Sequence, residues 1–409
     1  MTEAIKAHDA KDVEQAVQWA LAEGKTLELM GAGSKRAIGR PSQTDISLDL
    51  CGLSGISLYE PQELVLSAKA ATPLAEIEAL VASKGQQLAF EPMDCGPILG
   101  HSSGATLGGT LAANLSGPRR IKAGAARDHF LGFTAVSGRG ESFKSGGRVV
   151  KNVTGYDLCK LMAGSWGTLA ALTEVTIKIL PAPETEETVL LRGLAPERAV
   201  AAMTAAMASA ADVSGAAHLP RGLTARIPVR EIAGAADAVT ALRLEGFAPS
   251  VAYRAQSLET LVKSFGEAAR AGPVVSRALW QAIRDAAPFA SSGEGPQRPL
   301  WRISTVASRG AELAATVAKA LDSEVLFDWS GGLLWLSVGG TDDAGAAVIG
   351  RAVAQIGGHA TLMRASSGVR AAVAVFSAQD PVLGALTRRV KEGFDPKRVL
   401  NPGRMWAGV

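Results

Sequence analysis

Hydrophobic residues recur at helical spacing near the start of the chain. Over 11–23 the apolar side chains fall three or four positions apart, and Gly24 follows the last of them. This pattern predicts an amphipathic helix that ends at the glycine. Thr72 and Pro73 are typical of the first positions of a second helix. Short apolar runs predict strands at 26–30, 46–50 and 64–68. The first part of the chain therefore predicts a small α+β unit.

From residue 188 onward the pattern repeats itself. Apolar runs and amphipathic stretches predict the order strand, helix, strand, strand, helix, strand twice, which is the ferredoxin-like order. The first unit is predicted at 188–192, 196–211, 213–219, 223–229, 231–245 and 249–253. The second unit is predicted at 300–306, 308–321, 323–328, 333–338, 342–356 and 359–364. Two such units can share one antiparallel sheet with helices on one face.

The segments around these units suggest where the domains divide. Helices are predicted at 256–270 and 277–287, and the Ser-, Gly- and Pro-rich run 288–299 predicts a loop. Pro181 opens a short linker rich in Glu and Thr, and Asp380-Pro381 predicts the start of a last helix. We therefore expect a first domain at 1–183, a cap domain at 184–380, and a C-terminal helix and tail at 381–409 that return to the first domain.

Composition narrows the class of protein. The 409 residues are 47% hydrophobic and 20% charged, which is enough for a sizeable core. The net charge of +3 and the lack of any Lys/Arg block argue against nucleic-acid binding. The polar, acidic start and the short longest apolar run, 199–211, predict neither a signal peptide nor a transmembrane segment. We expect a cytoplasmic protein, with peripheral association to the inner face of the plasma membrane left open through partners.

The cysteines and histidines do not predict a metal site. Cys51, Cys95 and Cys159 lie far apart without CxxC spacing, and the five histidines show no paired spacing. Iron–sulfur clusters and zinc sites need such clustered ligands. We therefore expect no metal in this chain.

Glycine is concentrated between residues 100 and 181. Glycine permits positive φ and close approach of the backbone to a flat, phosphate-bearing ligand, whose charge successive N–H groups can bind. A second glycine turn, 31–35, follows the predicted strand 26–30 and adds a serine hydroxyl and a lysine ammonium. This is not the dinucleotide fingerprint GxGxxG, because Arg36 stands where a glycine is required. Together the two stretches predict a diphosphate site.

One motif suggests a different chemistry. Residues 100–104 match the GxSxG nucleophile elbow of serine hydrolases. The elbow requires a strand directly before it and a helix directly after it. Pro92 and Pro97 precede it here and a glycine-rich stretch follows, so we disfavour a hydrolase.

The glycine motifs resemble the FAD-binding domain of the PCMH-type, vanillyl-alcohol-oxidase flavoproteins. The matching motifs are MGAGSK at 30–35, TLGG at 106–109, NLSGP at 114–118, KNVTGYDL at 151–158, GSWGTL at 164–169 and FDPKRVLNPGR at 394–404. Within this family they are most similar to the FAD-binding E subunits of bacterial glycolate oxidases. The resemblance implies an α+β fold, with a PCMH-type FAD-binding domain of two subdomains followed by a cap domain.

The resemblance also implies the cofactor and its contacts. We expect noncovalent FAD, because the upstream loop has no histidine and no cysteine lies near the flavin motifs in the C-terminal domain. If attachment were covalent, His101 and His129 would be the first candidates. The implied FAD contacts are Gly31, Ala32, Gly33, Ser34, Lys35, Thr106, Leu107, Gly108, Gly109, Asn114, Ser116, Gly117, Gly155, Tyr156, Gly164, Thr168, Glu174, Val175, Ile177 and Asn401.

Catalytic residues are harder to identify. Oxidation of a 2-hydroxy acid requires a cation for the carboxylate and a base for the hydroxyl proton. Active relatives carry a GEHGxG-like motif in the cap, and the nearest segment here, 357–361, lacks its acidic residue and second glycine. The candidates for catalytic residues are therefore weak, and they are His359, Arg364 and Arg370. Further candidates to bind the substrate carboxylate are Arg221, Arg226 and Arg254.

The resemblance implies a function within a complex. It predicts the FAD-binding subunit of a glycolate (2-hydroxy-acid) dehydrogenase, which exchanges electrons with a D-type flavoprotein subunit and an iron–sulfur subunit. Two alternatives stay open. The chain could be a stand-alone flavin-dependent 2-hydroxy-acid dehydrogenase, or a structural subunit whose flavin site is unused.

Overall fold

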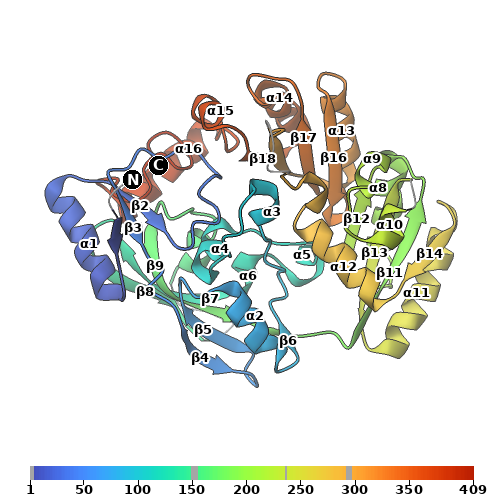
Figure 1. Cartoon of the computed structure of the whole chain (residues 1–409), viewed down its shortest axis with the longest axis horizontal. Coiled ribbons are helices and arrows are strands. Elements are labelled where there is room, and N and C mark those ends of the chain that lie inside the picture. Colours follow the sequence, from blue (N-terminus) through green and yellow to red (C-terminus); the bar gives the residue numbers. More distant parts are fainter. Residues whose placement is uncertain (1–3, 149–154, 235–236, 292–296) are drawn as a thin grey trace.

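The computed structural model describes residues 4–148, 155–234, 237–291 and 297–409. In Figure 1 they form two lobes, with the N-terminal part of the chain in one and the segment from about residue 185 to residue 364 in the other. The chain then returns to the first lobe, where both termini lie close together. The predicted α+β fold class, with a first domain followed by a cap, is confirmed.

The N-terminal strands form a small parallel sheet in the order β1-β3-β2. Its strands are β1 (Ala4–Lys6), β2 (Leu27–Met30) and β3 (Ile46–Asp49). Helix α1 (Ala10–Glu23) lies against this unit; Asp9 caps its start and Gly24, at φ 62°, ends it. The predicted helix at 11–23 and strands at 26–30 and 46–50 are confirmed.

A five-stranded antiparallel sheet forms the rest of the first lobe, in the order β4-β5-β9-β7-β8. Its strands are β4 (Ile56–Glu60), β5 (Val65–Lys69), β7 (Phe130–Ser137), β8 (Ser142–Gly146) and β9 (Ala170–Lys178). Its helices are α2 (Leu74–Ala82), α3 (Gly96–Leu99), α4 (Leu107–Ala113), α5 (Arg120–Ala123), α6 (Ala126–His129) and α7 (Leu158–Met162). A short pair, β6 (Gln86–Gln87) and β10 (Leu180–Pro181), closes the lobe.

Eight strands form the sheet of the second lobe, in the order β14-β11-β13-β12-β16-β17-β15-β18. The first half uses β11 (Thr185–Arg192), α8 (Pro196–Met207), β12 (Gly215–Leu219), β13 (Val239–Gly246), α11 (Ala248–Val262) and β14 (Ala268–Ala271). The second half uses β15 (Leu300–Thr305), α13 (Gly310–Ala318), β16 (Ser323–Asp328), β17 (Leu333–Val338), α14 (Ala346–Ile356) and β18 (Gly358–Arg364). Two ferredoxin-like units therefore meet at their second strands, β12 and β16.

The second unit agrees with its predicted elements, and so do the first three elements of the first unit, but the last three elements of the first unit do not. The predicted strand 223–229 is wrong, because α9 (Arg221–Thr224) and a turn before α10 (Arg230–Ala233) occupy it. The predicted helix 231–245 is also wrong. Its alanine-rich sequence favours a helix, yet Val239–Gly246 pairs with both β11 and β12. The predicted strand at 249–253 lies inside α11, where Pro249 occupies the first turn.

The segments that connect the units were predicted with mixed success. The helix expected at 277–287 appears as α12 (Pro273–Arg284), followed by η1 (Ala287–Phe289). The helix expected at 256–270 is mostly the end of α11 and then β14. Part of the predicted loop 288–299 lies outside the described residues. Further short elements are η2 (Ala307–Arg309), η3 (Trp329–Gly331) and α15 (Ser367–Ala372).

The last helix, α16 (Pro381–Phe394), carries the chain back to the first lobe, as Asp380-Pro381 predicts. Lys391 is fully buried there; it donates to the carbonyls of Thr168 at 2.6 Å and Leu400 at 2.9 Å, and pairs with Asp395 at 2.7 Å. These bonds hold the C-terminal tail against the glycine-rich segment.

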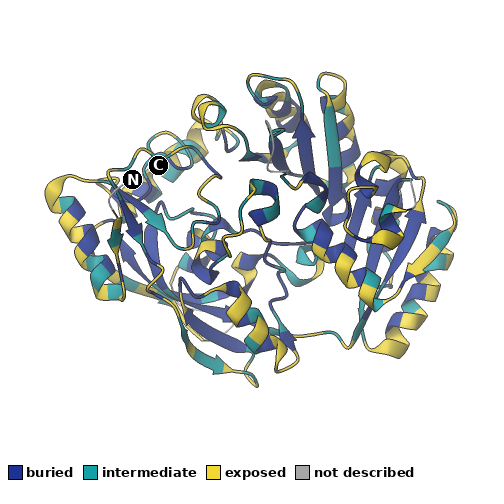
Figure 2. Cartoon of the chain, viewed as in Figure 1, coloured by how far each residue is buried: buried dark blue, intermediate teal, exposed yellow. Residues whose placement is uncertain are grey.

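Both faces of the second-lobe sheet are covered. Strands β12 and β17 are buried along their whole length, and Figure 2 shows most of the sheet in dark blue, with the first half of β16 in teal. Helices α8, α11, α13 and α14 pack on one face. Side chains of the first lobe, among them Met93, Cys95 and Ile98, pack in the core formed by the other face. The sheet is therefore fixed against the first lobe.

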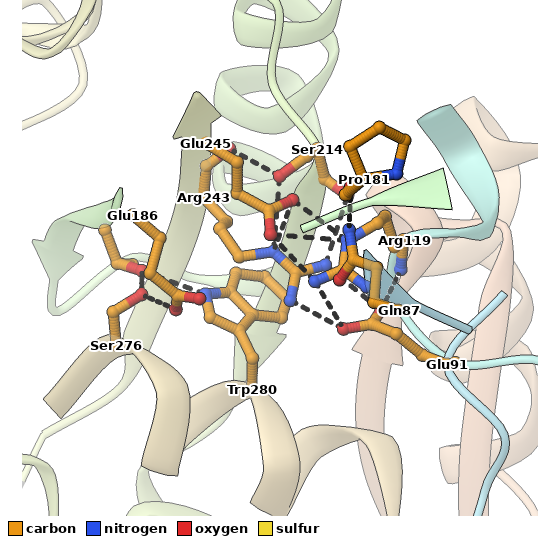
Figure 3. A network of polar contacts seen from close by, with 12 residues as sticks. Gln87, Glu91, Arg119, Pro181, Glu186, Ser214, Arg243, Glu245, Ser276 and Trp280 are labelled. Atoms are coloured by element: carbon orange, nitrogen blue, oxygen red, sulfur yellow. Dashed lines mark hydrogen bonds and ion pairs between the residues drawn. The ribbon is translucent and has the colours of Figure 1, made fainter. Parts of the chain in front are cut away.

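A buried network of charged side chains crosses this contact (Figure 3). Arg243 of β13 donates to Glu91 of the first lobe at 2.8 and 3.1 Å. Arg119 of the first lobe donates to Glu245 of β13 at 2.7 and 3.0 Å. Burial alone would raise the pKa of Glu245, but the charges of Arg243 and Arg119 and the bonds from Arg119 outweigh it and lower the pKa to about 2. Each lobe thus supplies one glutamate and one arginine to the network.

Candidate functional site

A cavity lies in the first lobe where β2, α4, β9 and the C-terminal tail meet. Strand β2 leads into its glycine turn, and the N-terminal end of α4 faces that turn. The lining residues are Glu28, Leu29, Met30, Gly31, Ala32, Gly33, Ser34, Lys35, Arg36, Leu50, Ala70, Ala71, Thr106, Gly108, Gly109, Ala112, Ala113, Trp166, Gly167, Ala170, Ala171, Leu172, Asn401 and Arg404. Backbone and small side chains make up most of this surface.

The turn after β2 has the geometry of an anion site. Gly33 adopts φ 73°, a left-handed conformation that glycine accepts without strain. Lys35 forms no ion pair within the described residues, and its ammonium lies 3.4 Å from the Ser34 hydroxyl. Burial lowers the pKa of Lys35, while the nearby Cys95 and Asp94 act in the opposite direction. A hydroxyl and a weakly paired ammonium are therefore available to an anionic ligand.

The start of α4 forms the opposite wall. Thr106 caps the helix, because its side-chain oxygen accepts from the N–H of Gly109 at 3.3 Å. A Cβ on Gly108 would lie 2.7 Å from that of Ala70, so this glycine is required by packing against β5. Gly109 is exposed toward the cavity and is absent from the residues with positive φ. A glycine at this position therefore matters because it leaves room in the cavity, and not because it permits positive φ. The wall can therefore accept a ligand in close contact with the backbone.

Asn401 joins the tail to the cavity. Its Oδ1 accepts from the N–H of Leu29 at 2.9 Å, and its Nδ2 donates to the carbonyl of Trp166 at 2.9 Å. A Cβ on Gly167 would lie 2.6 Å from this Nδ2. The NPGR segment thus braces two walls of the cavity.

The structure brings together only part of the predicted cofactor set. The predicted residues that line the cavity are Gly31, Ala32, Gly33, Ser34, Lys35, Thr106, Gly108, Gly109 and Asn401. Leu107, Val175 and Ile177 are instead buried in the hydrophobic core, and Glu174 lies on β9 outside the lining. Their position suggests that they support the cavity walls.

The other predicted residues lie in the turns around α4 and α7. Asn114 accepts from the N–H of Arg127 at 3.1 Å, Ser116 from that of Ala126 at 2.8 Å, and the Thr168 hydroxyl donates to Ser165. The Gly117 carbonyl accepts a bond from the second lobe, and Gly164 adopts φ 87°. Gly155 and Tyr156 are exposed. They follow residues 149–154, which lie outside the described residues and include the first four residues of the predicted KNVTGYDL motif.

Sequence reasoning missed several lining residues. Three alanine pairs, at 70–71, 112–113 and 170–171, line the cavity, together with Trp166, Gly167 and Arg404. These residues could have been found from one signal in the sequence, the paired alanines at the ends of β5 and α4 and at the start of β9. Arg404 is buried, and its guanidinium donates to the carbonyl of Lys35 at 2.8 Å.

The weak catalytic candidates have other partners or lie apart. Arg364 donates to the carbonyls of Arg298, Ile98 and Phe289, and Arg370 donates to that of Gly39. Arg254 donates to the carbonyls of Ala211 and Glu245, and Arg226 pairs with Glu324 at 2.5 Å. Arg221 lies exposed at the start of α9. His359 lies on β18 and is exposed; desolvation and the charges of Arg302 and Arg120 lower its pKa.

The GxSxG match does not form a nucleophile elbow. Helix α3, not a strand, ends directly before Gly100, and the next helix begins only at Leu107. Within the described ranges no group of His, Cys, Asp and Glu side chains could hold a metal ion. Over the same part of the chain, every helix is too short or too polar to cross a bilayer.

The cavity has the features that FAD requires of a protein. FAD combines a diphosphate with flat ring systems, so its site needs N–H donors, a cation and walls without bulky side chains. The glycine turn with Lys35 supplies the first two, and the alanine pairs and Gly109 supply the walls. The Cβ distances at Gly31 and Gly109, 3.1 and 3.0 Å from the Thr106 hydroxyl, show how closely turn and helix approach.

Comparisons with known proteins agree with this site. A family model described as "FAD binding domain" matches residues 3–146. The chain is 33% identical to glycolate oxidase subunit GlcE of Escherichia coli over 394 residues, which is 96% of both chains. It is 42% identical over 86 residues to glycolate oxidase subunit GlcD of Bacillus subtilis, a match to 21% of this chain and 18% of that one. Among solved structures, p-cresol methylhydroxylase aligns with a TM-score of 0.71 and 14% identity, covering 99% of this chain and 88% of the other.

The structural alignment establishes the fold, and the sequence alignment with GlcE establishes the family. The GlcE match covers both lobes and the C-terminal tail, whereas the FAD-binding model covers only the first lobe. The chain therefore belongs to the family of glycolate oxidase subunit GlcE, within the FAD-binding PCMH-type flavoproteins.

Proposed function

We propose that this chain is the FAD-carrying subunit of a dehydrogenase complex for glycolate or a related 2-hydroxy acid. The observation that carries the proposal is the coincidence of two findings: a cavity suited to FAD and a relative, a glycolate oxidase subunit, that aligns with the whole chain. We assign FAD binding to 1–183, a cap to 184–380, and a returning helix and tail to 381–409.

The cavity residues would hold FAD through backbone and small side chains. The N–H groups of the 31–35 turn, the Ser34 hydroxyl and the Lys35 ammonium would bind the diphosphate. The start of α4 at Gly108 and Gly109 and the three alanine pairs would exclude water from the rings. Bound FAD supplies two-electron redox chemistry, and the protein supplies its position and surroundings.

We expect the flavin to be bound without a covalent bond. His129 is buried, and both its ring nitrogens already contact backbone carbonyls, those of Ala123 at 2.9 Å and Lys178 at 3.3 Å. His101 contacts the Ser34 carbonyl at 2.9 Å, so it is the histidine to examine first. Acid precipitation of the purified chain should release all yellow colour into the supernatant. Colour that stays in the pellet, and is lost in His101→Ala, would contradict this expectation.

Electrons that reach the flavin need an acceptor. The three cysteines are isolated, one exposed and two buried, and desolvation raises their pKa values to about 11 for Cys51 and Cys95 and about 12 for Cys159. These three cysteines are therefore unsuited to act jointly as the ligands of an iron–sulfur cluster. We propose that a D-type flavoprotein subunit and an iron–sulfur subunit complete the electron path, in the cytoplasm or on the inner face of the plasma membrane through those partners.

Co-expression tests this assignment. The three chains together should elute as one complex that reduces a dye with glycolate, and this chain alone should give little dye reduction, because its segment 357–361 lacks the acidic residue and second glycine of the motif that active relatives carry. Two results would count against it. The isolated chain could reduce the dye as fast as the mixture, which would favour a stand-alone dehydrogenase. Alternatively, the chains could elute separately at micromolar concentration.

A further inference from the structure

Arg302 is a buried cation whose Nη2 atom has no hydrogen-bond partner among the described residues. It lies on β15, is only 9% exposed, and its Nη2 atom is enclosed with no acceptor in the described part of the chain. Its Cζ lies 4.9 Å from the ring centre of Trp329 and 5.9 Å from that of Trp335. Burial and the charge of Arg120 lower the pKa of Arg302 to about 10. Aromatic rings stabilise such a cation only in part.

A second arginine approaches the same tryptophan from the other lobe. Arg120 begins α5, and its Cζ lies 4.2 Å from the ring centre of Trp329. Within the described ranges its guanidinium forms neither an ion pair nor a hydrogen bond. Its neighbour Arg119 differs, because Arg119 pairs with both Glu91 and Glu245. Two positive charges thus lie against one ring, and neither forms an ion pair in the part of the chain that the structure describes.

Asp328, the acid whose charge acts on Arg302, neutralises it only in part. Asp328 precedes Trp329, is fully buried, and accepts from the Trp329 N–H at 2.7 Å. Desolvation raises the pKa of Asp328 to about 7, against the weaker effects of the Trp329 bond, Arg243 and Arg302. Near neutral pH this carboxyl is therefore charged only part of the time. An unpaired buried cation is destabilising, so its presence suggests a ligand that supplies the negative charge.

The tryptophan is held firmly in place. Its backbone has φ 50°, an unfavourable value for a bulky residue, and its indole N–H donates to the carbonyl of Gly117 at 3.0 Å. That bond spans the two lobes. Trp329 therefore fixes the distance between Arg302 on the cap sheet and Arg120 on the first lobe.

One buried thiol lies within electrostatic reach of both the proposed flavin cavity and Arg302. The Cys95 thiol experiences the charges of both Lys35, in the cavity wall, and Arg302. Arg302 and His359 project from the same face of the sheet, since β15 and β18 pair Arg302 with Thr361 and Ser304 with His359. His359 is exposed, so this face of the sheet reaches solvent at His359.

We propose that Arg302 and Arg120, held beside Trp329, bind the carboxylate of a small organic acid at the junction of the two lobes. The inference rests on the proposed function and adds the residues that bind the carboxylate of its ligand, a short 2-hydroxy acid or the corresponding 2-oxo acid. A guanidinium can bind a carboxylate through two parallel N–H···O bonds, and the partly apolar surroundings strengthen them. The sequence-based candidates Arg364 and Arg370 have guanidiniums already bonded to backbone carbonyls.

Ligand binding to the purified full-length chain tests this site. Isothermal titration with glycolate, oxalate and the uncharged analogue glycolamide should show binding of the two acids only. Arg302→Met should weaken oxalate binding about 10- to 100-fold, the loss expected for a hydrogen-bonded charge pair, and Arg120→Met should weaken it too. Arg309→Met is the matched control. Arg309 is a cap arginine on the surface that pairs with Glu312, so its loss should leave oxalate affinity unchanged.

Stability separates a ligand site from a structural arginine. Without ligand, Arg302→Met should melt at the wild-type temperature or above it, because an unpaired buried charge is removed; the shift caused by oxalate should disappear. A lower melting temperature with unchanged oxalate affinity would overturn the proposal. Equal binding of sulfate and oxalate would overturn the carboxylate class.

Flavin content distinguishes this proposal from the proposed function. If Arg302→Met purifies without flavin while the wild-type chain is yellow, the guanidinium holds the cofactor and the proposal is overturned. If the wild-type chain carries no flavin but still binds oxalate through Arg302, the anion site stands and FAD binding by this chain fails.

Discussion

Gly109→Val is expected to abolish flavin binding while leaving the fold intact. Gly109 lies on the exposed cavity wall at the start of α4, and a Cβ there would meet only the Thr106 hydroxyl, at 3.0 Å. The valine methyl groups would therefore occupy the space proposed for the cofactor and disturb the cap of α4. The purified variant should lack the visible absorption of oxidised flavin and keep its far-ultraviolet circular dichroism.

Gly350→Val is the matched control for this experiment. Gly350 is also an exposed glycine within a helix, α14, but no atom lies within 4 Å of its added Cβ. This variant should retain flavin at the wild-type ratio, although valine is a modest helix former. A Gly109→Val protein that purifies with one flavin per chain would place the cofactor elsewhere.

Glu91→Gln is expected to destabilise the protein by about 3–5 kcal/mol, the usual cost of removing one partner from a buried ion pair. Glu91 accepts from Arg243 at 2.8 and 3.1 Å, and from the N–H of Arg119 at 2.5 Å. In this variant Arg119 and Arg243 would share Glu245 as the paired carboxylate that remains in the network (Figure 3). The urea midpoint should fall, and the two lobes should lose protection from proteolysis together.

The pH dependence of stability provides the check. Burial would raise the pKa of Glu91, but Arg243 and Arg119 outweigh it and lower the value, as they do for Glu245. A carboxylate with a lowered folded-state pKa stabilises the fold above its ordinary value near ~4.3, and this contribution is lost as the pH falls toward the folded value. Wild type should therefore lose stability steeply below about pH 4.5, and Glu91→Gln less steeply.

An exposed pair is the control for the network. Glu312 pairs with Arg309 at 2.6 Å, but both side chains are well exposed. Glu312→Gln should leave the urea midpoint close to the wild-type value, because an exposed ion pair contributes little to stability. If Glu91→Gln behaves like Glu312→Gln, the network does not hold the lobes together.

Local signals predicted the first lobe and the second half of the cap. The helix before Gly24 and the strand before Gly31 each carry their own boundary residues, so sequence alone located them. Strand β13 could not be predicted in this way. Its sequence favours a helix, and only pairing with β11 and β12 makes it a strand. Proline at 249 was the missed sign that α11 begins there.

The cavity was predicted where it depends on consecutive residues, as at 31–35 and 106–109. It was missed where distant small residues meet, as at Ala70-Ala71 and Ala170-Ala171, because strand pairing between β5 and β9 brings them together. Arg302 was missed for a related reason. Its lack of a partner becomes visible only when β15, α5 and the Trp329 turn are placed side by side.

The absorption spectrum of the purified full-length chain tests the central claim most directly. The chain should be isolated without partners, incubated with FAD and desalted before the spectrum is recorded. The account predicts the bands of oxidised flavin at about one flavin per chain, and their loss in Gly109→Val. A folded chain that remains colourless after incubation with excess FAD would contradict it.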